Sequence, residues 1–130
     1  MHRLKWLSVA VLGMAAVALA ADNTPPEGFT ALFNGKDITG WKGLVGSPKS
    51  RATMTPEALA EAEKKATEAA VQHWKVVDGV IEYDGKANSL CTAKDYANFE
   101  MYVDCKIHKG GDSGIYIRGT PQVQIWDNPV

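Results

Sequence analysis

The stretch Gly110–Asp127, which reads GGDSGIYIRGTPQVQIWD, contains two short runs in which apolar and polar residues alternate. Because successive side chains of a strand point to opposite faces, this period of two predicts two short strands. One face is apolar and holds Ser113, Ile115, Ile117, Val123 and Ile125. The other face carries aromatic rings, a guanidinium group and two amides, from Tyr116, Arg118, Gln122, Gln124 and Trp126.

The polar face of this stretch suits a sugar. A pyranose ring has an apolar side that fits an aromatic ring, and a girdle of hydroxyls that amides and guanidinium groups can bind. A phosphate or a nucleic acid more often requires several cations, and Arg118 is the only lysine or arginine in this stretch. The alternative is an ordinary solvated sheet face with polar residues.

The composition excludes several classes of partner. The chain has 130 residues, a net charge of −1 and a pI near 6.3, and its lysines and arginines form no basic block. With 45% hydrophobic residues and 12 glycines, it is typical of one β-rich globular domain. We expect a small-molecule partner, no nucleic acid, and no membrane once the amino terminus is processed.

The amino terminus has the pattern of a secretory signal peptide over residues 1–20. A positively charged segment precedes an apolar run at residues 6–17, and Ala18-Leu19-Ala20 forms a small-x-small cleavage site. A membrane anchor is the alternative, but the apolar run is shorter than the ~20 residues that span a bilayer. We therefore expect a periplasmic or secreted protein with a linker at residues 21–27 and one domain at residues 28–130.

A helix is predicted over about residues 55–73. Thr55 supplies a hydroxyl N-cap, Pro56 takes the first helical position, and Glu57 places an acid near the positive end of the helix dipole. The stretch before it, residues 43–55, has the composition of a loop. We interpret the helix as an insertion on the outside of the domain, with a partner-binding helix as the alternative.

Beyond the helix the pattern has period two. The segment 74–83 predicts a hairpin with its turn at Asp78-Gly79. Further strands are predicted at residues 29–33, 89–92 and 99–108. Short antiparallel strands with a single helix predict an all-β fold, namely an antiparallel β-sandwich.

Cys91 and Cys105 have two possible states. If the segments around them pair across a turn at residues 96–99, they lie nearly opposite each other and a disulfide can form. Cys105 is also in phase with the apolar residues of the segment 99–108, which favours a buried free thiol. The chain has no CxxC motif, so we expect no catalytic cysteine.

The sequence stops directly after the second strand of Gly110–Asp127. A sandwich with only part of its strands leaves edges unpaired and apolar faces uncovered. We therefore expect this chain to be the amino-terminal part of a longer protein, with the remainder of the sandwich missing.

Several motifs together resemble the 3-keto-disaccharide hydrolase family. They are GFTALFNGKDITGW (28–41), WKVVDGVI (74–81), LCTAKDYANFEMYVDCKI (90–107), GGDSGIYIRG (110–119) and QVQIWD (122–127). The resemblance implies a concanavalin A-like jelly roll of two curved antiparallel sheets, with a sugar site on the concave face. It also implies an oxidised sugar as substrate and a divalent metal as a possible cofactor.

The chemistry that the resemblance implies needs one base and strong stabilisation of oxygen charge at C3 of the sugar. We expect Arg118 and Gln124 to donate hydrogen bonds to that oxygen or to sugar hydroxyls, and Asp127 to serve as a catalytic carboxylate. The expected substrate-binding residues are Tyr116, Trp126, Gln122 and Asp112. No metal-ligand spacing such as HExxH is present, so the metal candidates are only Asp127 and His108.

Each of these roles has a structural alternative. Asp112 suits a turn within GGDSG, Arg118 could pair with Asp104 across the sheet, and Trp126 could belong to the core. His73, at the helix end, suits an interaction with the dipole rather than chemistry.

Two classes of function remain open at this point. One is an exported enzyme that cleaves 3-keto-glycosides by deprotonation at C2, elimination and hydration. The other is a non-catalytic carbohydrate-binding module on the same scaffold, because a fold does not determine a function.

Overall fold

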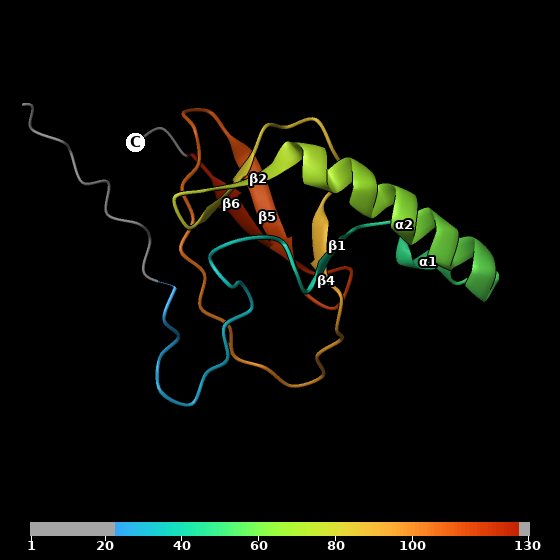
Figure 1. Ribbon diagram of the computed structural model, residues 1–130, viewed down its shortest axis with the longest axis horizontal. Helices are drawn as coiled ribbons and strands as arrows, with labels where there is room; N and C mark the ends of the chain where they lie inside the picture. The colour runs from blue at the N-terminus through green and yellow to red at the C-terminus, as the bar shows by residue number, and fades with distance from the viewer. Residues whose placement is uncertain (1–22, 128–130) are drawn as a thin grey trace, which may run out of the picture.

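The computed structural model describes residues 23–127. Its elements follow the chain in the order β1 (Trp41–Gly43), α1 (Pro48–Arg51), α2 (Pro56–His73), β2 (Trp74–Val77), β3 (Val80–Tyr83), β4 (Leu90–Thr92), β5 (Asp112–Tyr116) and β6 (Gln122–Trp126) (Figure 1). The strands form three two-stranded antiparallel sheets, β1–β4, β2–β3 and β5–β6. Small antiparallel sheets agree with the expected all-β class. The predicted signal peptide lies outside the described residues.

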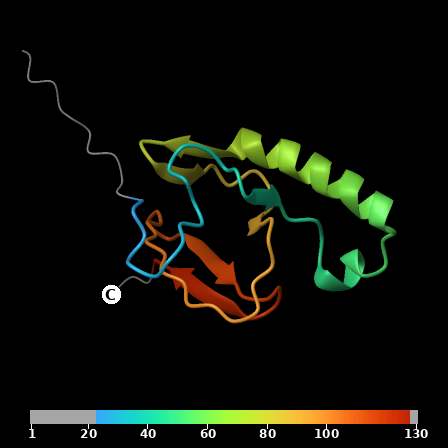
Figure 2. The ribbon, with the colours of Figure 1, turned by 60° about the horizontal axis from the view of Figure 1, so that its bottom comes forward.

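The long helix α2 lies on one side of the three sheets (Figure 2). Figure 2 shows α2 and the β2–β3 hairpin on one side, the β5–β6 hairpin on the other, and the β1–β4 pair between them. Neither helix within residues 23–127 has the length and apolar character of a membrane span.

Helix α2 begins where the sequence predicts. The Thr55 hydroxyl accepts a hydrogen bond from the Ala58 N–H, and Pro56 occupies the first turn. At the other end, His73 Nδ1 lies 2.9 Å from Asp84 Oδ2, so the helix is tied to the segment that follows β3. This contact holds the pKa of Asp84 below its usual value, chiefly through the hydrogen bond with His73.

The helix packs on β1 through a glycine. Gly43 is buried, and a side chain there would overlap the Ala66 carbonyl of α2. Its N–H donates to Thr67 Oγ1 at 3.2 Å, and the neighbouring Lys42 forms a 2.6 Å ion pair with Glu63. Glycine is therefore needed here because strand and helix backbones approach closely.

Part of the loop predicted for residues 43–55 is instead helix α1. Ser47 and Ser50 form a reciprocal capping box, and Pro48 takes the first turn. The sequence signal for α1 is the pair Ser47-Pro48, which is of the same type as Thr55-Pro56, but the helix that follows is only one turn long.

The β2–β3 hairpin was predicted correctly. Its turn residues, Asp78 and Gly79, have φ angles of 49° and 77°, as a two-residue type I′ turn requires. Trp74 and Tyr83 face each other across the ladder, and their rings stack at 4.0 Å with an angle of 9° between planes. An aromatic cross-strand pair thus stabilises the β2–β3 hairpin.

Two predicted strands are absent. Residues 29–33 and 99–108 form no ladder, and within the described part of the chain no strand pairs with them. They instead contact each other, because the Phe29 ring packs edge-on against Tyr102 with centroids 5.0 Å apart. A segment with an alternating pattern becomes a strand only if a neighbouring strand supplies the ladder hydrogen bonds. Neither segment has such a partner among the described residues.

The cysteines do not pair. Cys91 lies in β4 opposite Lys42 of β1, and both Cys91 and Cys105 are free thiols. The prediction of a buried Cys105 is wrong, because this side chain is exposed. Burial raises the pKa of the half-buried Cys91 thiol, which disfavours its nucleophilic thiolate form.

Little apolar surface is enclosed among the described residues. Ala70 on α2 is 1% exposed and is the one apolar side chain there that is fully buried. Val123, on the apolar face of β5–β6, remains 52% exposed.

Candidate functional site

The candidate site is the polar face of the β5–β6 hairpin. The register pairs Asp112 with Trp126, Gly114 with Gln124, and Tyr116 with Gln122. Directly opposite residues of an antiparallel pair project to the same face. Five of the seven predicted catalytic and substrate-binding residues therefore share one surface: Asp112, Tyr116, Gln122, Gln124 and Trp126.

Asp112 organises one end of this face. Its Oδ1 accepts hydrogen bonds from the Gln124 side-chain amide and, at 3.0 Å, from Trp126 Nε1. Gln124 Nε2 also donates to the Ser113 carbonyl at 3.0 Å. Asp112 lies in β5 rather than in a turn, so the structural alternative considered for it is wrong.

The aromatic residues of this face are open to solvent. Trp126 is 64% exposed and Tyr116 is 56% exposed, so the alternative that placed Trp126 in the core is wrong. Between them, the Gln122 side chain lies over Gly114, where an added Cβ would overlap its amide. The glycine thus leaves room for an amide between the two rings.

The alternation predicted that Arg118 lies on the polar strand face, and this prediction is wrong. The strand ends at Tyr116, and Arg118 lies in a turn where it and Gly119 have φ angles of 52° and 87°. The turn is closed by the Thr120 N–H, which donates to the Ile117 carbonyl at 3.4 Å. A positive φ in a non-glycine residue is uncommon and costs conformational energy.

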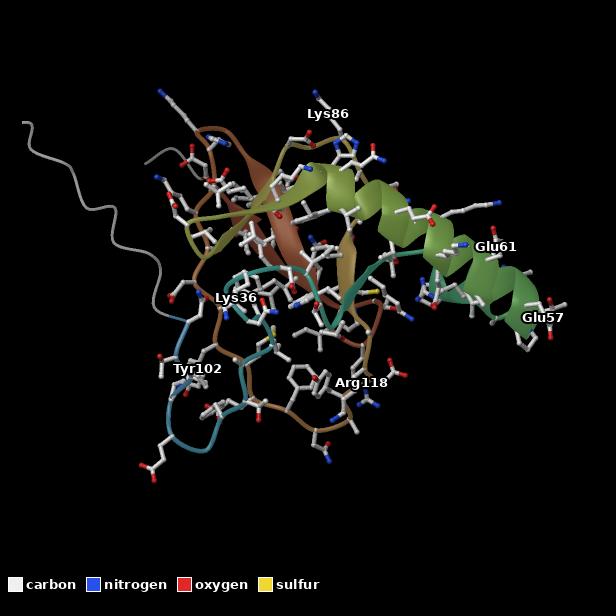
Figure 3. All side chains as sticks on the ribbon, in the orientation of Figure 1. Lys36, Glu57, Glu61, Lys86, Tyr102 and Arg118 are labelled. Carbon is white, nitrogen blue, oxygen red and sulfur yellow. The ribbon has the colours of Figure 1, made fainter. Side chains whose placement is uncertain are left out.

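The Arg118 guanidinium makes no ion pair with Asp104 or with any other described carboxylate. Figure 3 shows Arg118 below helix α2, and a Cβ at the neighbouring Gly119 would come 3.4 Å from Pro48 of α1. Tyr116 is four residues from Asp112, about 13 Å along a strand. Arg118 and the Asp112 end are therefore at opposite ends of the hairpin.

Asp127 lies just beyond the Trp126 end of the face. Its Oδ2 accepts the Gly110 N–H at 2.6 Å, and its own N–H donates to the Gly111 carbonyl at 3.1 Å. The nearby turn is closed by the Gly111 N–H, which donates to the His108 carbonyl at 2.8 Å. Asp127 thus anchors this turn and remains at the edge of the candidate site.

A metal centre is not formed by the described residues. Within residues 23–127, no three His, Cys, Asp or Glu side chains converge as metal ligands. The candidates Asp127 and His108 thus lack a third ligand in this part of the chain, and the residues present do not fit the metal implied by the resemblance.

The polar face is an open surface. Two open hollows of about 500 and 460 Å³ were found in the described part, and neither is lined by β5 or β6. One lies between the segment 23–36 and the Asp78-Gly79 turn, and the other lies beside α2 and Lys42.

Sequence reasoning identified the members of this face but missed the contacts among them. The interactions of Asp112 with Trp126 and of Gln122 with Gly114 depend on strand register. The available signal was the alternation itself, which places Asp112 and Trp126 on one face but does not decide which residues stand opposite each other.

The described chain is thus a β-rich domain with an exposed face of aromatic rings and amides. The family model of the 3-keto-alpha-glucoside-1,2-lyase-like domain matches residues 28–130. The chain therefore belongs to this family.

One curated relative is a 3-keto-disaccharide hydrolase of Bacteroides thetaiotaomicron. It is 27% identical over 99 residues, which cover 69% of this chain and 27% of the relative. The chain thus spans about a quarter of the relative's length. No solved structure gives a significant match.

Proposed function

We propose that this chain contributes the sugar-binding face of an exported enzyme that cleaves 3-keto-glycosides, 3-keto-disaccharides among them. Family membership and the relative's name support the reaction class. The observation that carries the proposal is the β5–β6 face, where two exposed aromatic rings, two amides and Asp112 share one surface. Because the chain matches about a quarter of its relative, the activity is proposed for the whole protein that contains it.

The chemistry requires only a few protein groups. In a glycoside oxidised at C3, the ketone acidifies the C2 proton, and a base removes it to give an enolate. The enolate expels the glycosidic oxygen from C1, and that oxygen takes up a proton. Water then adds at C1 of the resulting 3-keto-2-hydroxyglucal. This route differs from ordinary glycoside hydrolysis, in which two carboxylates flank an oxocarbenium-like transition state.

The proposed roles follow from position on the hairpin. Trp126 and Tyr116 stack on sugar rings, and Gln122 and Gln124 bind hydroxyl groups. Asp112 and Asp127, the carboxylates at one end, accept hydrogen bonds from sugar hydroxyls there. Because C2 and C3 are neighbouring atoms of one ring, the base is proposed to lie on the Arg118 side and to come from the rest of the whole protein.

Arg118 supplies positive charge for a developing oxyanion from the other end of the hairpin. One ligand reaches both ends only if it is longer than a single ring, which favours a disaccharide.

The remaining features of the proposal concern the whole protein. The antiparallel hairpins are proposed to belong to a concanavalin A-like jelly roll formed by residues 28–130 together with further strands. Residues 1–20 are proposed to direct export to the periplasm or beyond. Fractionation of cells and sequencing of the mature amino terminus test this, and retention in the cytoplasm with Met1 intact contradicts it.

A second candidate function is a non-catalytic carbohydrate-binding module. The observation that favours it is the exposure of Trp126 and Tyr116 on the β5–β6 face, because catalytic sites usually lie in clefts.

Turnover separates the two candidates. The protein that carries this domain is incubated with 3-keto-trehalose, with and without EDTA, and released glucose is measured. We expect release by the enzyme, and loss of release in EDTA only if a divalent ion is required. Sugar binding without release assigns the domain as a module, and the absence of both overturns both candidates.

A further inference from the structure

The hydrogen bonds around Asp112 determine what this end of the hairpin offers a ligand. The Gln124 amide group has two N–H bonds, and its nitrogen donates to Asp112 Oδ1 and to the Ser113 carbonyl. Both partners accept hydrogen bonds and cannot donate them. The reverse orientation of the amide would set its oxygen against two other oxygens, so the observed orientation is the stable one.

The groups left free are therefore acceptors. Gln124 presents its carbonyl oxygen, and Trp126, whose N–H is donated to Asp112, presents only its ring face. Within the described residues, Asp112 Oδ2 has no hydrogen-bond partner. The nearby His108 and Lys109 form no ion pair with Asp112 or Asp127.

On this basis we infer that the Asp112 end of the β5–β6 hairpin is an acceptor-only subsite for a neutral, hydroxyl-bearing pyranose ring. Asp112 acts there as a positioning residue for Gln124 and Trp126 and as a hydroxyl acceptor. The inference rests on the proposed function and deepens it by naming the sugars that the face selects.

Two consequences follow for the ligand. Hydroxyl groups donate to Asp112 Oδ2 and Gln124 Oε1 while the ring lies on Trp126. A ketone accepts hydrogen bonds only, so the C3 oxygen points away from these two groups. A sugar carboxylate or phosphate is repelled by the Asp112 charge. The expectation from sequence that Gln124 donates to the C3 oxygen is thus replaced by an acceptor role.

Matched probes test this selectivity on the protein that carries this domain. Binding of methyl α-glucopyranoside and of its 6-carboxylate, methyl α-glucuronide, is measured by NMR titration of the Trp126 indole N–H, assigned with Trp126→Phe. We expect the neutral sugar to bind at least tenfold more tightly. In Asp112→Asn the ratio falls to near one and the indole N–H resonance shifts, because the charge is removed while the shape is kept.

Two further variants complete the test. Gln124→Leu is expected to weaken the neutral sugar about tenfold without improving the anionic one, because Asp112 stays charged. Asp104→Asn, an exposed carboxylate with no partner among the described residues, leaves both affinities unchanged. Equal affinities in the wild type, or an unchanged ratio in Asp112→Asn, overturn the inference. Turnover of 3-keto-trehalose alongside such a result leaves the proposed function standing, and the expected ratio without turnover leaves a binding subsite.

Discussion

The β2–β3 and β5–β6 hairpins use similar residues for opposite purposes. Each has two aromatic residues and a turn whose central pair, Asp78-Gly79 or Arg118-Gly119, has positive φ. In β2–β3 the ladder places Trp74 opposite Tyr83, so the rings stack on each other. In β5–β6 the ladder pairs Tyr116 and Trp126 with polar residues instead, and both rings stay exposed.

The hydrogen bonds of the aromatic residues also differ between the two hairpins. Trp74 Nε1 donates to the Asn88 carbonyl at 3.0 Å, and the Tyr83 hydroxyl donates to the Ala87 carbonyl. These bonds tie the aromatic pair to the chain that follows β3. Trp126 instead donates to a carboxylate within its own face. Register, rather than composition, therefore decides whether an aromatic residue stabilises the fold or is available to a ligand.

The largest expected effect comes from the Arg118-Gly119 turn. Arg118→Ala should lower kcat/KM for 3-keto-trehalose about 100- to 1,000-fold, because a donor to a developing oxyanion is lost. Arg118→Gly should lose as much activity while raising Tm, since glycine adopts a φ of 52° without strain. Lys109→Ala, which also removes an exposed cation, serves as the control and should keep full activity. Activity within threefold of wild type in both Arg118 variants would remove this residue from the site.

Replacing the tryptophan of each hairpin should have different effects: the change in β5–β6 should weaken sugar binding, and the change in β2–β3 should lower stability. Trp126→Ala should weaken sugar binding about tenfold with little change in stability, because the ring packs on little protein. Trp74→Ala should lower the free energy of unfolding by about 2 kcal/mol and leave kcat/KM of the folded protein unchanged. Urea unfolding and titration calorimetry measure the two effects. If both variants lose mainly stability, the distinction between the hairpins is wrong.

A smaller effect is expected at Gly114. Gly114→Ala should displace the Gln122 amide and weaken sugar binding about threefold, with stability changed by less than about 1 kcal/mol because a flexible side chain gives way. Gln122→Ala should weaken binding equally, and the double variant should lose no more than either single one. Additive losses in this cycle would show that the two residues act separately.

The smallest effect concerns acid. Because the folded-state pKa of Asp84 lies below its usual value, the contribution of Asp84 to stability is present above the unfolded-state pKa and is lost as the pH falls through the folded-state pKa. Asp84→Asn should therefore flatten the fall in Tm at acid pH. Asp95→Asn, an exposed carboxyl with no hydrogen bond among the described residues, is the control. If Asp84→Asn and the wild type show the same fall in Tm with pH, the His73–Asp84 contact does not contribute to the acid sensitivity.

Local signals in the sequence predicted a substantial part of this structure. Thr55-Pro56 and Asp78-Gly79 determine backbone geometry through their own side chains or φ preferences, so the start of α2 and the β2–β3 turn were correct. Residues 29–33 and 99–108 failed as predicted strands because pairing depends on a neighbour that alternation does not reveal.

Alternation in Gly110–Asp127 was enough to say which side chains share a face, because that follows from the geometry of an extended chain. It could not say which of them touch. The loop between β5 and β6 is longer than the two residues between β2 and β3, and it sets Asp112 opposite Trp126. A slip of one residue would place polar side chains of β5 opposite apolar ones of β6. The hydrogen bonds that make Gln124 an acceptor exist only in the folded register, since they join residues more than ten positions apart.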